Sequence, residues 1–203
     1  MSFEFLMTTL IVVLAPGIGA IYTLSVGLSS GPKASIVAAF GCTLAILPSV
    51  LACIFGLAAL LHTSALAFQI LKYAGVLYLM YLAWQTLRQS GSLPIQKTAP
   101  NRNYAEITRK AILLNVLNPK LTVFFLAFLP QFIPADAPHP SALIASLGAV
   151  FMGVTFLVFV IYGLFASKIG EMLQRRPRIF IWMQRGIAGT FAAFGIKLAL
   201  AEQ

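Results

Sequence analysis

Six long apolar runs take up most of this chain of 203 residues and leave little sequence outside them. A helix needs about 20 consecutive, mostly apolar residues to cross the hydrocarbon core of a bilayer. Only 9% of the residues are charged, against about 25% in a typical soluble domain. We therefore predict an all-α integral membrane protein with six transmembrane helices. The predicted segments are Phe3–Leu28, Ser35–Leu61, Ser64–Leu87, Ala111–Ile133, Ala142–Ala166 and Ile179–Leu200.

The basic residues gather in short polar segments beside the apolar runs. Most lie between Arg88 and Lys110 or between Lys168 and Arg178. Loops rich in Lys and Arg stay on the cytoplasmic side of a membrane, so six spans place both termini on the outer side. The net charge of +9 thus indicates orientation beside membrane lipid, and we predict no nucleic-acid partner.

The two halves of the chain correspond at a nearly constant offset. Pro16 matches Pro119, Gly41 matches Gly148, and Gly56 matches Gly163. Because each half contains an odd number of spans, the second half enters the membrane from the opposite face. We predict two inverted three-helix repeats, residues 1–88 and 111–203, joined by a cytoplasmic loop at 89–110.

Helix-breaking residues interrupt the first and fourth runs. Pro16 and Gly17 lie about halfway along the first run, and Pro119 lies within the fourth. Proline removes a main-chain donor, and freed main-chain groups are tolerated in a bilayer only where they face protein or a watery cavity. Matching interruptions in two inverted halves indicate a transporter's substrate site. A purely structural kink is the alternative at either proline, since proline is common in transmembrane helices.

Lys120 is the residue of the fourth run that most strongly indicates a functional site. At the rise of an α-helix it lies about 15 Å inside the membrane. A charge at that depth is a functional-site hypothesis by default, and the sequence places its acidic residues in loops or at the ends of the runs. We expect Lys120 to bind a substrate carboxylate, with Asn115 and Asn118 adding amide donors and acceptors. Main-chain carbonyls around Ala15 would accept from an ammonium group, so a zwitterion fits. A neutral lysine, or one that snorkels to an interface, is the alternative.

Three further residues are secondary candidates. Lys72 and Arg185 occupy comparable positions in the third and sixth runs, where snorkelling also explains them, and Gly41 suits a close helix crossing. Cys42 and Cys53 fall in one predicted helix, about 16 Å apart and too distant for a disulfide. We predict no catalytic residues, no metal site and no cofactor.

The quoted residues resemble a known family of carriers. The first run, LAPGIGAIYTLSVGLSSGPK, and the fourth, RKAILLNVLNPKLTVFFLAFLPQF, resemble the corresponding segments of the LysE/RhtB family of bacterial amino-acid exporters. The resemblance covers nearly the whole chain and includes the NPK element at Asn118, Pro119 and Lys120. It implies a multi-pass carrier in the bacterial inner membrane, with both termini periplasmic, that moves amino acids or their derivatives outward.

Two positions depart from the family's pattern. Family members often have TPGP followed by a polar residue in the first segment, whereas this chain has APGIG at 15–19. Many also carry an aspartate in the second segment at about the position of Ile46. The resemblance therefore leaves open which amino acid is moved and which ion is coupled.

Amino-acid efflux by alternating access is the leading functional hypothesis, with neutral substrates favoured because the predicted spans contain no acid, except at their ends, to pair with a cationic side chain. If transport is coupled to protons, we expect Lys120 to titrate, since no other acid or base of the usual relays lies within the spans. A membrane thiol oxidoreductase is one alternative, although both cysteines lie in a single run. A passive small-solute channel is another. The sequence leaves open whether the carrier works as a monomer or as a homodimer.

Overall fold

The structure is a computed structural model that describes residues 2–15, 17–61, 102–134 and 137–174, together with isolated helical positions between 70 and 88 and between 185 and 196. All regular structure within these residues is helical. The predicted third and sixth spans lie largely outside the described residues, and the four other predicted spans lie within them.

The first predicted span consists of two helices with a break between them. Helix α1 covers Phe3–Leu14, and its first turn is capped by the Ser2 hydroxyl, which accepts from the Phe5 main-chain N–H at 3.3 Å. Helix α2 covers Ile18–Ser30 and ends at Gly31, whose φ of +87° lies in the region that favours glycine. The axes of α1 and α2 differ in direction by 55°.

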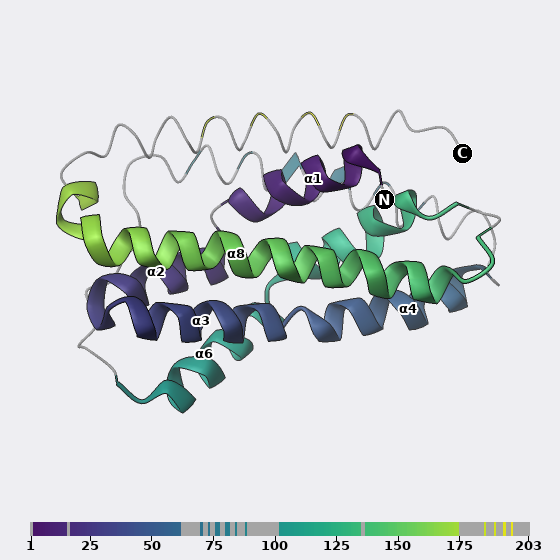
Figure 1. Ribbon diagram of the computed structural model, residues 1–203. Helices are drawn as coiled ribbons and strands as arrows, with labels where there is room; N and C mark the ends of the chain where they lie inside the picture. The colour runs from purple at the N-terminus through teal and green to yellow at the C-terminus, as the bar shows by residue number, and fades with distance from the viewer. Residues whose placement is uncertain are drawn as a thin grey trace.

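The second span is nearly continuous. Helix α3 covers Pro32–Leu44 and begins with a proline at its first turn, where no N–H is needed. Helix α4 covers Leu47–Leu61 and follows after a short turn at Ala45 and Ile46. Figure 1 shows α3 and α4 running on in the same direction, and together they pass the length and hydropathy required of one membrane span over Pro32–Gly56.

The fourth predicted span is again broken. Helix α6 covers Tyr104–Val116, and helix α7 covers Pro119–Val123. The chain continues as a π-helical turn, η1 at Phe124–Phe128, and a 3₁₀ turn, η2 at Leu129–Phe132. The two parts bend by 51°. Helix α6 begins earlier than the predicted apolar start at Ala111, because Asn103 caps it and its polar first turns need no bilayer around them.

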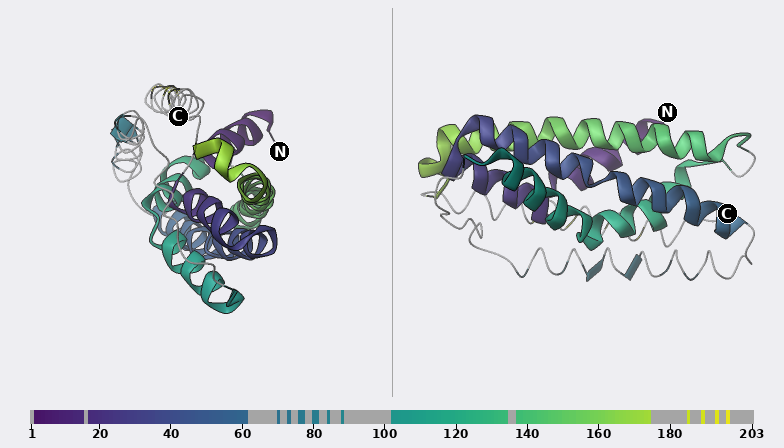
Figure 2. Two further views of the ribbon diagram at one scale, coloured as in Figure 1. Left: turned by 90° about the vertical axis from the view of Figure 1, so that its left-hand side faces the viewer. Right: turned by 90° about the horizontal axis from the view of Figure 1, so that it is seen from below.

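The fifth span is a single long helix, α8, over Pro140–Gln174. Its 35 residues would extend about 52 Å at 1.5 Å per residue, well beyond a hydrocarbon core of about 30 Å. Figures 1 and 2 show α8 between α1 on one side and α3 on the other, with α6 packed on the far side of α3. Helix α8 is therefore the central element of the described bundle.

Two helices in the described part of the chain are long and apolar enough to cross a membrane, and the two bent pairs raise this to four if each forms one span. The fold is thus that of an all-α membrane protein. The predicted six-helix inverted repeat is not tested by this part of the chain.

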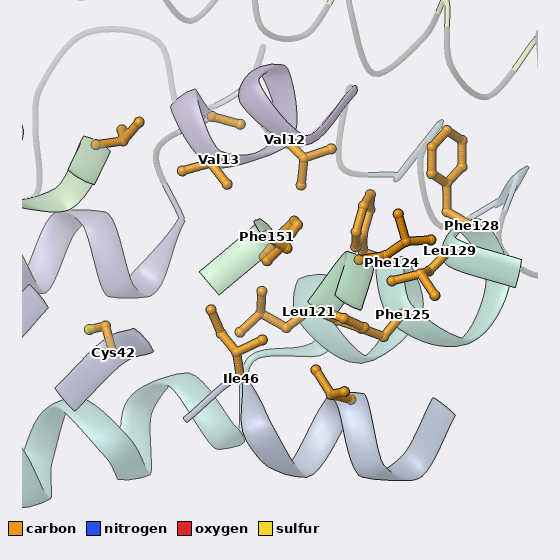
Figure 3. Packing of buried hydrophobic residues seen from close by; sticks show 14 of the residues in the cluster. Val12, Val13, Cys42, Ile46, Leu121, Phe124, Phe125, Phe128, Leu129 and Phe151 are labelled. Carbon is orange, nitrogen blue, oxygen red and sulfur yellow. The ribbon is translucent and has the colours of Figure 1, made fainter. Parts of the chain in front are cut away.

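Phenylalanine side chains fill the core beside the second break. Phe124 and Phe125 of η1 contact Phe151 of α8, with ring centroids 4.8 and 5.1 Å apart. Phe132 of η2 packs edge-on against Phe5 of α1 at 5.2 Å. Figure 3 shows Phe151 between the α1 valines, Val12 and Val13, and Leu121 of α7. The aromatic core therefore holds α1, the second broken helix and α8 together.

Glycines allow the helices to approach closely elsewhere. A Cβ atom at Gly27 of α2 would collide with the main-chain carbonyl of Gly163 on α8, and one at Gly163 would lie 2.5 Å from the Ser35 Cβ of α3. Close crossings of this kind let main chains pack tightly in a membrane. They bring α2, α3 and α8 together.

Candidate functional site

The two helix breaks meet in space. The Lys120 side chain, in the first turn of α7, donates from Nζ to the Ala15 carbonyl oxygen at 2.8 Å. Ala15 is the last residue before the break in the first span. The hydrogen bond therefore joins two interruptions that lie 105 positions apart in the chain.

The second break is built from the sequence Asn118-Pro119. Asn118 caps α7, because its side-chain oxygen accepts from the Lys120 main-chain N–H at 3.1 Å. Pro119 occupies the first helical position, where its missing N–H leaves nothing unpaired. This local geometry restarts the helix and fixes the Lys120 side chain at the break.

A chain of amide hydrogen bonds extends from this cap into the core. The Asn118 side-chain nitrogen donates to the Asn115 side-chain oxygen at 3.3 Å, and the Asn115 nitrogen donates to the Cys42 carbonyl at 2.7 Å. Both asparagines are buried, at 2% and 6% relative exposure for Asn115 and Asn118. The amides connect the second break to α3 and restrict both side chains.

The main-chain carbonyls at the end of α1 accept hydrogen bonds from side chains in the second half of the chain. Besides the Lys120 contact to Ala15, the Tyr162 hydroxyl of α8 donates to the Leu14 carbonyl at 2.8 Å. The last carbonyls of a helix lack intrahelical partners and carry the negative end of its dipole. The C-terminal end of α1 therefore attracts donors and cations, and in this structure Lys120 is one of them.

A small cavity of about 20 Å³ lies against the two breaks. This is room for about one water molecule, so the cavity in this structure is too small to hold an amino acid. The lining residues come from α1, α2, α6, α7 and α8 and from the breaks between them: Val12, Val13, Gly17, Gly19, Ala20, Asn115, Asn118, Lys120, Leu121, Phe151, Thr155 and Phe159.

The cavity has a polar wall, and the rest of its lining is mainly apolar. Asn115, Asn118 and Lys120 form the polar wall beside Gly17 and Gly19. The other lining residues are apolar apart from a single threonine, Thr155, among those that the structure describes. A lining that combines hydrogen-bonding groups with hydrocarbon suits a small amphipathic solute.

Glycines leave room for the polar wall. A Cβ atom at Gly19 would lie 2.6 Å from the Asn115 side-chain oxygen, so no larger residue fits while Asn115 keeps its position. At Gly17 a Cβ atom would make ordinary contacts, 3.6 Å from Lys120 Nζ and 3.7 Å from the Asn118 nitrogen. Gly19 is thus required by packing, and Gly17 keeps space next to the lysine.

The structure brings together four of the residues that the sequence singled out, namely Gly17, Asn115, Asn118 and Lys120, with Pro119 between the last two. Pro16 and Lys72 lie outside the described residues. Arg185 is helical and exposed, and Gly41 packs against Thr108 and Ala111 of α6 rather than lining the cavity. That any of these residues binds substrate stays a prediction.

Sequence reasoning missed the α8 wall of the cavity. Phe151, Thr155 and Phe159 are spaced four residues apart, so they lie on one face of a helix. The spacing is visible in the sequence, but the surrounding run is apolar in every direction and gives no sign of which face meets the breaks. Cys42 and Cys53, predicted to be separate thiols, are both free and buried.

Comparison with known proteins identifies the family of this chain. The model of the LysE type translocator family matches residues 10–202. The chain belongs to this family. This translocator is 33% identical over 199 residues to an uncharacterized membrane protein of Vibrio cholerae, and the match covers 98% of this chain and 96% of the relative.

Other relatives carry a functional name. The translocator is 29% identical over 200 residues to a homoserine/homoserine lactone efflux protein of Salmonella typhimurium, a match that covers 98% of this chain and 96% of that protein. An equally named protein of Salmonella typhi has the same identity and coverage. No solved structure matches the chain significantly. The family and the names of these relatives indicate that the chain is an amino-acid exporter, and thus a transporter rather than an enzyme.

Proposed function

We propose that this translocator exports neutral amino acids across the bacterial inner membrane as a secondary carrier. The single observation that carries the proposal is the hydrogen bond from Lys120 to the Ala15 carbonyl across the two helix breaks. The cationic donor that a zwitterion's carboxylate requires and the main-chain acceptor that its ammonium group requires are thereby held side by side at the cavity.

In the proposed complex the substrate separates these two groups. Its carboxylate pairs with the Lys120 ammonium, and its own ammonium replaces Lys120 at the C-terminal end of α1. Discontinuous helices are used in this way by other carriers, where helix ends and unwound main chain bind the charged ends of the substrate. Few hydrogen bonds are lost when the substrate binds, because Lys120 and the carbonyl at the end of α1 each exchange one partner for another.

Neutral side chains are favoured by the lining of the cavity and by the named relatives. None of the described residues that line the cavity is acidic, so a basic side chain would meet no counter-charge there. Homoserine, which appears in the names of the two Salmonella relatives, is a neutral amino acid. We take it as the first candidate substrate.

Alternating access is the proposed mode of transport. The breaks in α1–α2 and in α6–α7 have similar bends of 55° and 51°, as expected if residues 1–88 and 111–203 are inverted repeats. Rocking of one half against the other would then open the cavity to each side in turn. A channel would need no such alternation.

Counterflow in proteoliposomes tests the proposal. Vesicles containing the purified protein are loaded with unlabelled homoserine, and uptake of a trace of labelled homoserine is followed without any ion gradient. A carrier gives a transient accumulation above the outside concentration, whereas a channel gives only equilibration. The same assay with leucine, lysine and glutamate measures the preference for neutral substrates.

A variant without thiols separates transport from redox chemistry. In the Cys42→Ala/Cys53→Ala protein, counterflow should match the native protein, because transport makes no use of the two buried thiols. Loss of counterflow in a folded double variant would show that the thiols are needed and would favour the oxidoreductase alternative. Absence of counterflow with every amino acid in the native protein would contradict the proposed function.

A further inference from the structure

Three side chains of α8 line the cavity together with the polar residues of the breaks. Phe151, Thr155 and Phe159 each line the cavity, and all three are buried, at 1%, 3% and 7% relative exposure. If the charged ends of a substrate bind at Lys120 and Ala15, as the proposed function states, its side chain lies among the other residues that line the cavity, and these three are among them.

Thr155 is the polar residue of these three, and its hydroxyl proton is already engaged. Thr155 Oγ1 donates to the Phe151 carbonyl, one turn earlier in α8, at 2.8 Å. A hydroxyl oxygen has two lone pairs in addition to its proton. Toward the cavity Thr155 is therefore an acceptor, held at a fixed position by its own helix.

The rings on either side limit what can reach this acceptor. Phe151 is fixed by contacts with Phe124 and Phe125, and Phe159 stacks on Tyr162 with an interplanar angle of 15°. Tyr162 in turn is hydrogen-bonded to Leu14. The two rings are thus held by neighbours, and they enclose Thr155 between apolar faces.

We propose that Thr155 is a specificity-determining residue, which accepts a hydrogen bond from a donor on the substrate side chain and so selects small hydroxylated amino acids over aliphatic ones of the same size. The selection has a physical basis in burial. A site built to bond a substrate hydroxyl disfavours the analogue without it, because the buried polar group then loses its water without gaining a partner.

Competition between isosteric substrates tests this assignment. Homoserine and norvaline differ only in a terminal hydroxyl in place of a methyl group. The native protein should prefer homoserine, measured as the ratio of kcat/KM values in proteoliposomes. In Thr155→Val, an isosteric change that removes the acceptor, the ratio should shift toward norvaline by about tenfold. A tenfold change corresponds to the free energy that one hydrogen bond typically contributes.

Two variants serve as controls. Thr43→Val removes another buried hydroxyl that bonds its own helix, to Ala39 at 2.9 Å, but Thr43 does not line the cavity. It should leave the homoserine to norvaline ratio unchanged. Thr155→Ser retains the acceptor and should also retain the preference. Because each ratio is measured within one preparation, the amount of folded carrier cancels.

The outcomes separate the two proposals. Transport of both substrates with the same ratio in native, Thr155→Val and Thr43→Val proteins would overturn the role of Thr155 and leave the exporter function intact. A native preference for norvaline would overturn it as well. If the native protein transports no amino acid, the proposed function fails, and the role of Thr155 fails with it.

Discussion

A lysine that donates to a main-chain carbonyl across two helix breaks does two things at residue scale. It stabilises the C-terminal end of α1, whose carbonyls lack helical partners, and it keeps the lysine side-chain nitrogen at the cavity. Substrate binding must break the first of these interactions in order to use the second. The Lys120 side chain is therefore the group whose position is expected to change most between the empty and loaded carrier.

The two glycines beside the lysine differ in what a methyl group would do. In Gly19→Ala the new Cβ atom would lie 2.6 Å from the Asn115 oxygen, so Asn115 must leave its 2.7 Å bond to the Cys42 carbonyl. Overpacking of this kind costs about 1–3 kcal/mol. We expect a lower melting temperature in detergent and loss of most counterflow.

Gly17→Ala is the matched comparison, because its Cβ atom would meet its neighbours at 3.6 Å or more. It should destabilise the protein less than Gly19→Ala does, and it should weaken transport by filling space next to Lys120. Equal melting temperatures for the two variants would show that Asn115 moves aside without cost.

Much of the polar wall could be predicted at this scale. Asn115, Asn118 and Lys120 stand out in the sequence because they are polar in an apolar run, and the structure gathers them with Gly17. The carbonyls near Ala15 were expected to accept from a substrate ammonium, whereas in the structure the Ala15 carbonyl accepts from Lys120. That contact could not be predicted, since it depends on the bend angles and on how the two halves pack.

At the scale of elements, the main feature is the way the second broken helix restarts after its break. The cap at Asn118 restarts α7, and η1 and η2 continue it with π and 3₁₀ geometry rather than α geometry. π-Helical turns occur frequently at functional sites. Composition could not predict η1, because its phenylalanines fit an α-helix equally well.

The cap of α7 can be tested separately from the charge. Asn118→Ala removes the oxygen that accepts from the Lys120 N–H at 3.1 Å, and loss of such a cap costs about 1 kcal/mol. Asn118→Ser can keep the cap with its hydroxyl. The Ala variant should unfold at a lower temperature than the Ser variant, and indistinguishable melting curves would contradict the role of Asn118 as a cap.

The crossing of α2, α3 and α8 gives a second test of the elements. Gly163→Ala would place a Cβ atom 2.5 Å from the Ser35 Cβ, whereas Gly153→Ala, on the same helix, meets no described residue within 4 Å. We expect the first change to destabilise the protein by about 1–3 kcal/mol and the second to be nearly neutral. Thermal unfolding in detergent compares them directly, and a stable Gly163→Ala protein would contradict the crossing.

At the scale of the whole molecule, the described helices leave a cavity of only about 20 Å³ at the two breaks. Hydropathy and charge predicted the membrane class, because it depends on summed composition. Within the described residues two helices, or four if each bent pair forms one span, are long and apolar enough to cross a membrane. The small size of the cavity depends on side-chain packing among helices far apart in the sequence. No single segment carries that information.

The predicted orientation is testable by labelling single cysteines in the Cys42→Ala/Cys53→Ala background. Both termini are predicted to be periplasmic, which puts Ser2 and the loop at His139 outside and Lys33 and Arg102 inside. A membrane-impermeant thiol reagent should label Ser2→Cys and His139→Cys in cells with a permeable outer membrane. It should reach Lys33→Cys and Arg102→Cys only after the inner membrane is lysed, and the reverse pattern would invert the topology.

The most direct test of the account measures what Lys120 recognises. Counterflow of homoserine and of its amide, which lacks the carboxylate, is compared in native and Lys120→Met proteins that have equal melting behaviour. If Lys120 pairs with the substrate carboxylate, the native protein should prefer homoserine, and Lys120→Met should lose at least tenfold in kcat/KM for homoserine while changing much less for the amide. Equal losses of kcat/KM for both substrates, or no loss for either, would contradict the pairing of Lys120 with the substrate carboxylate.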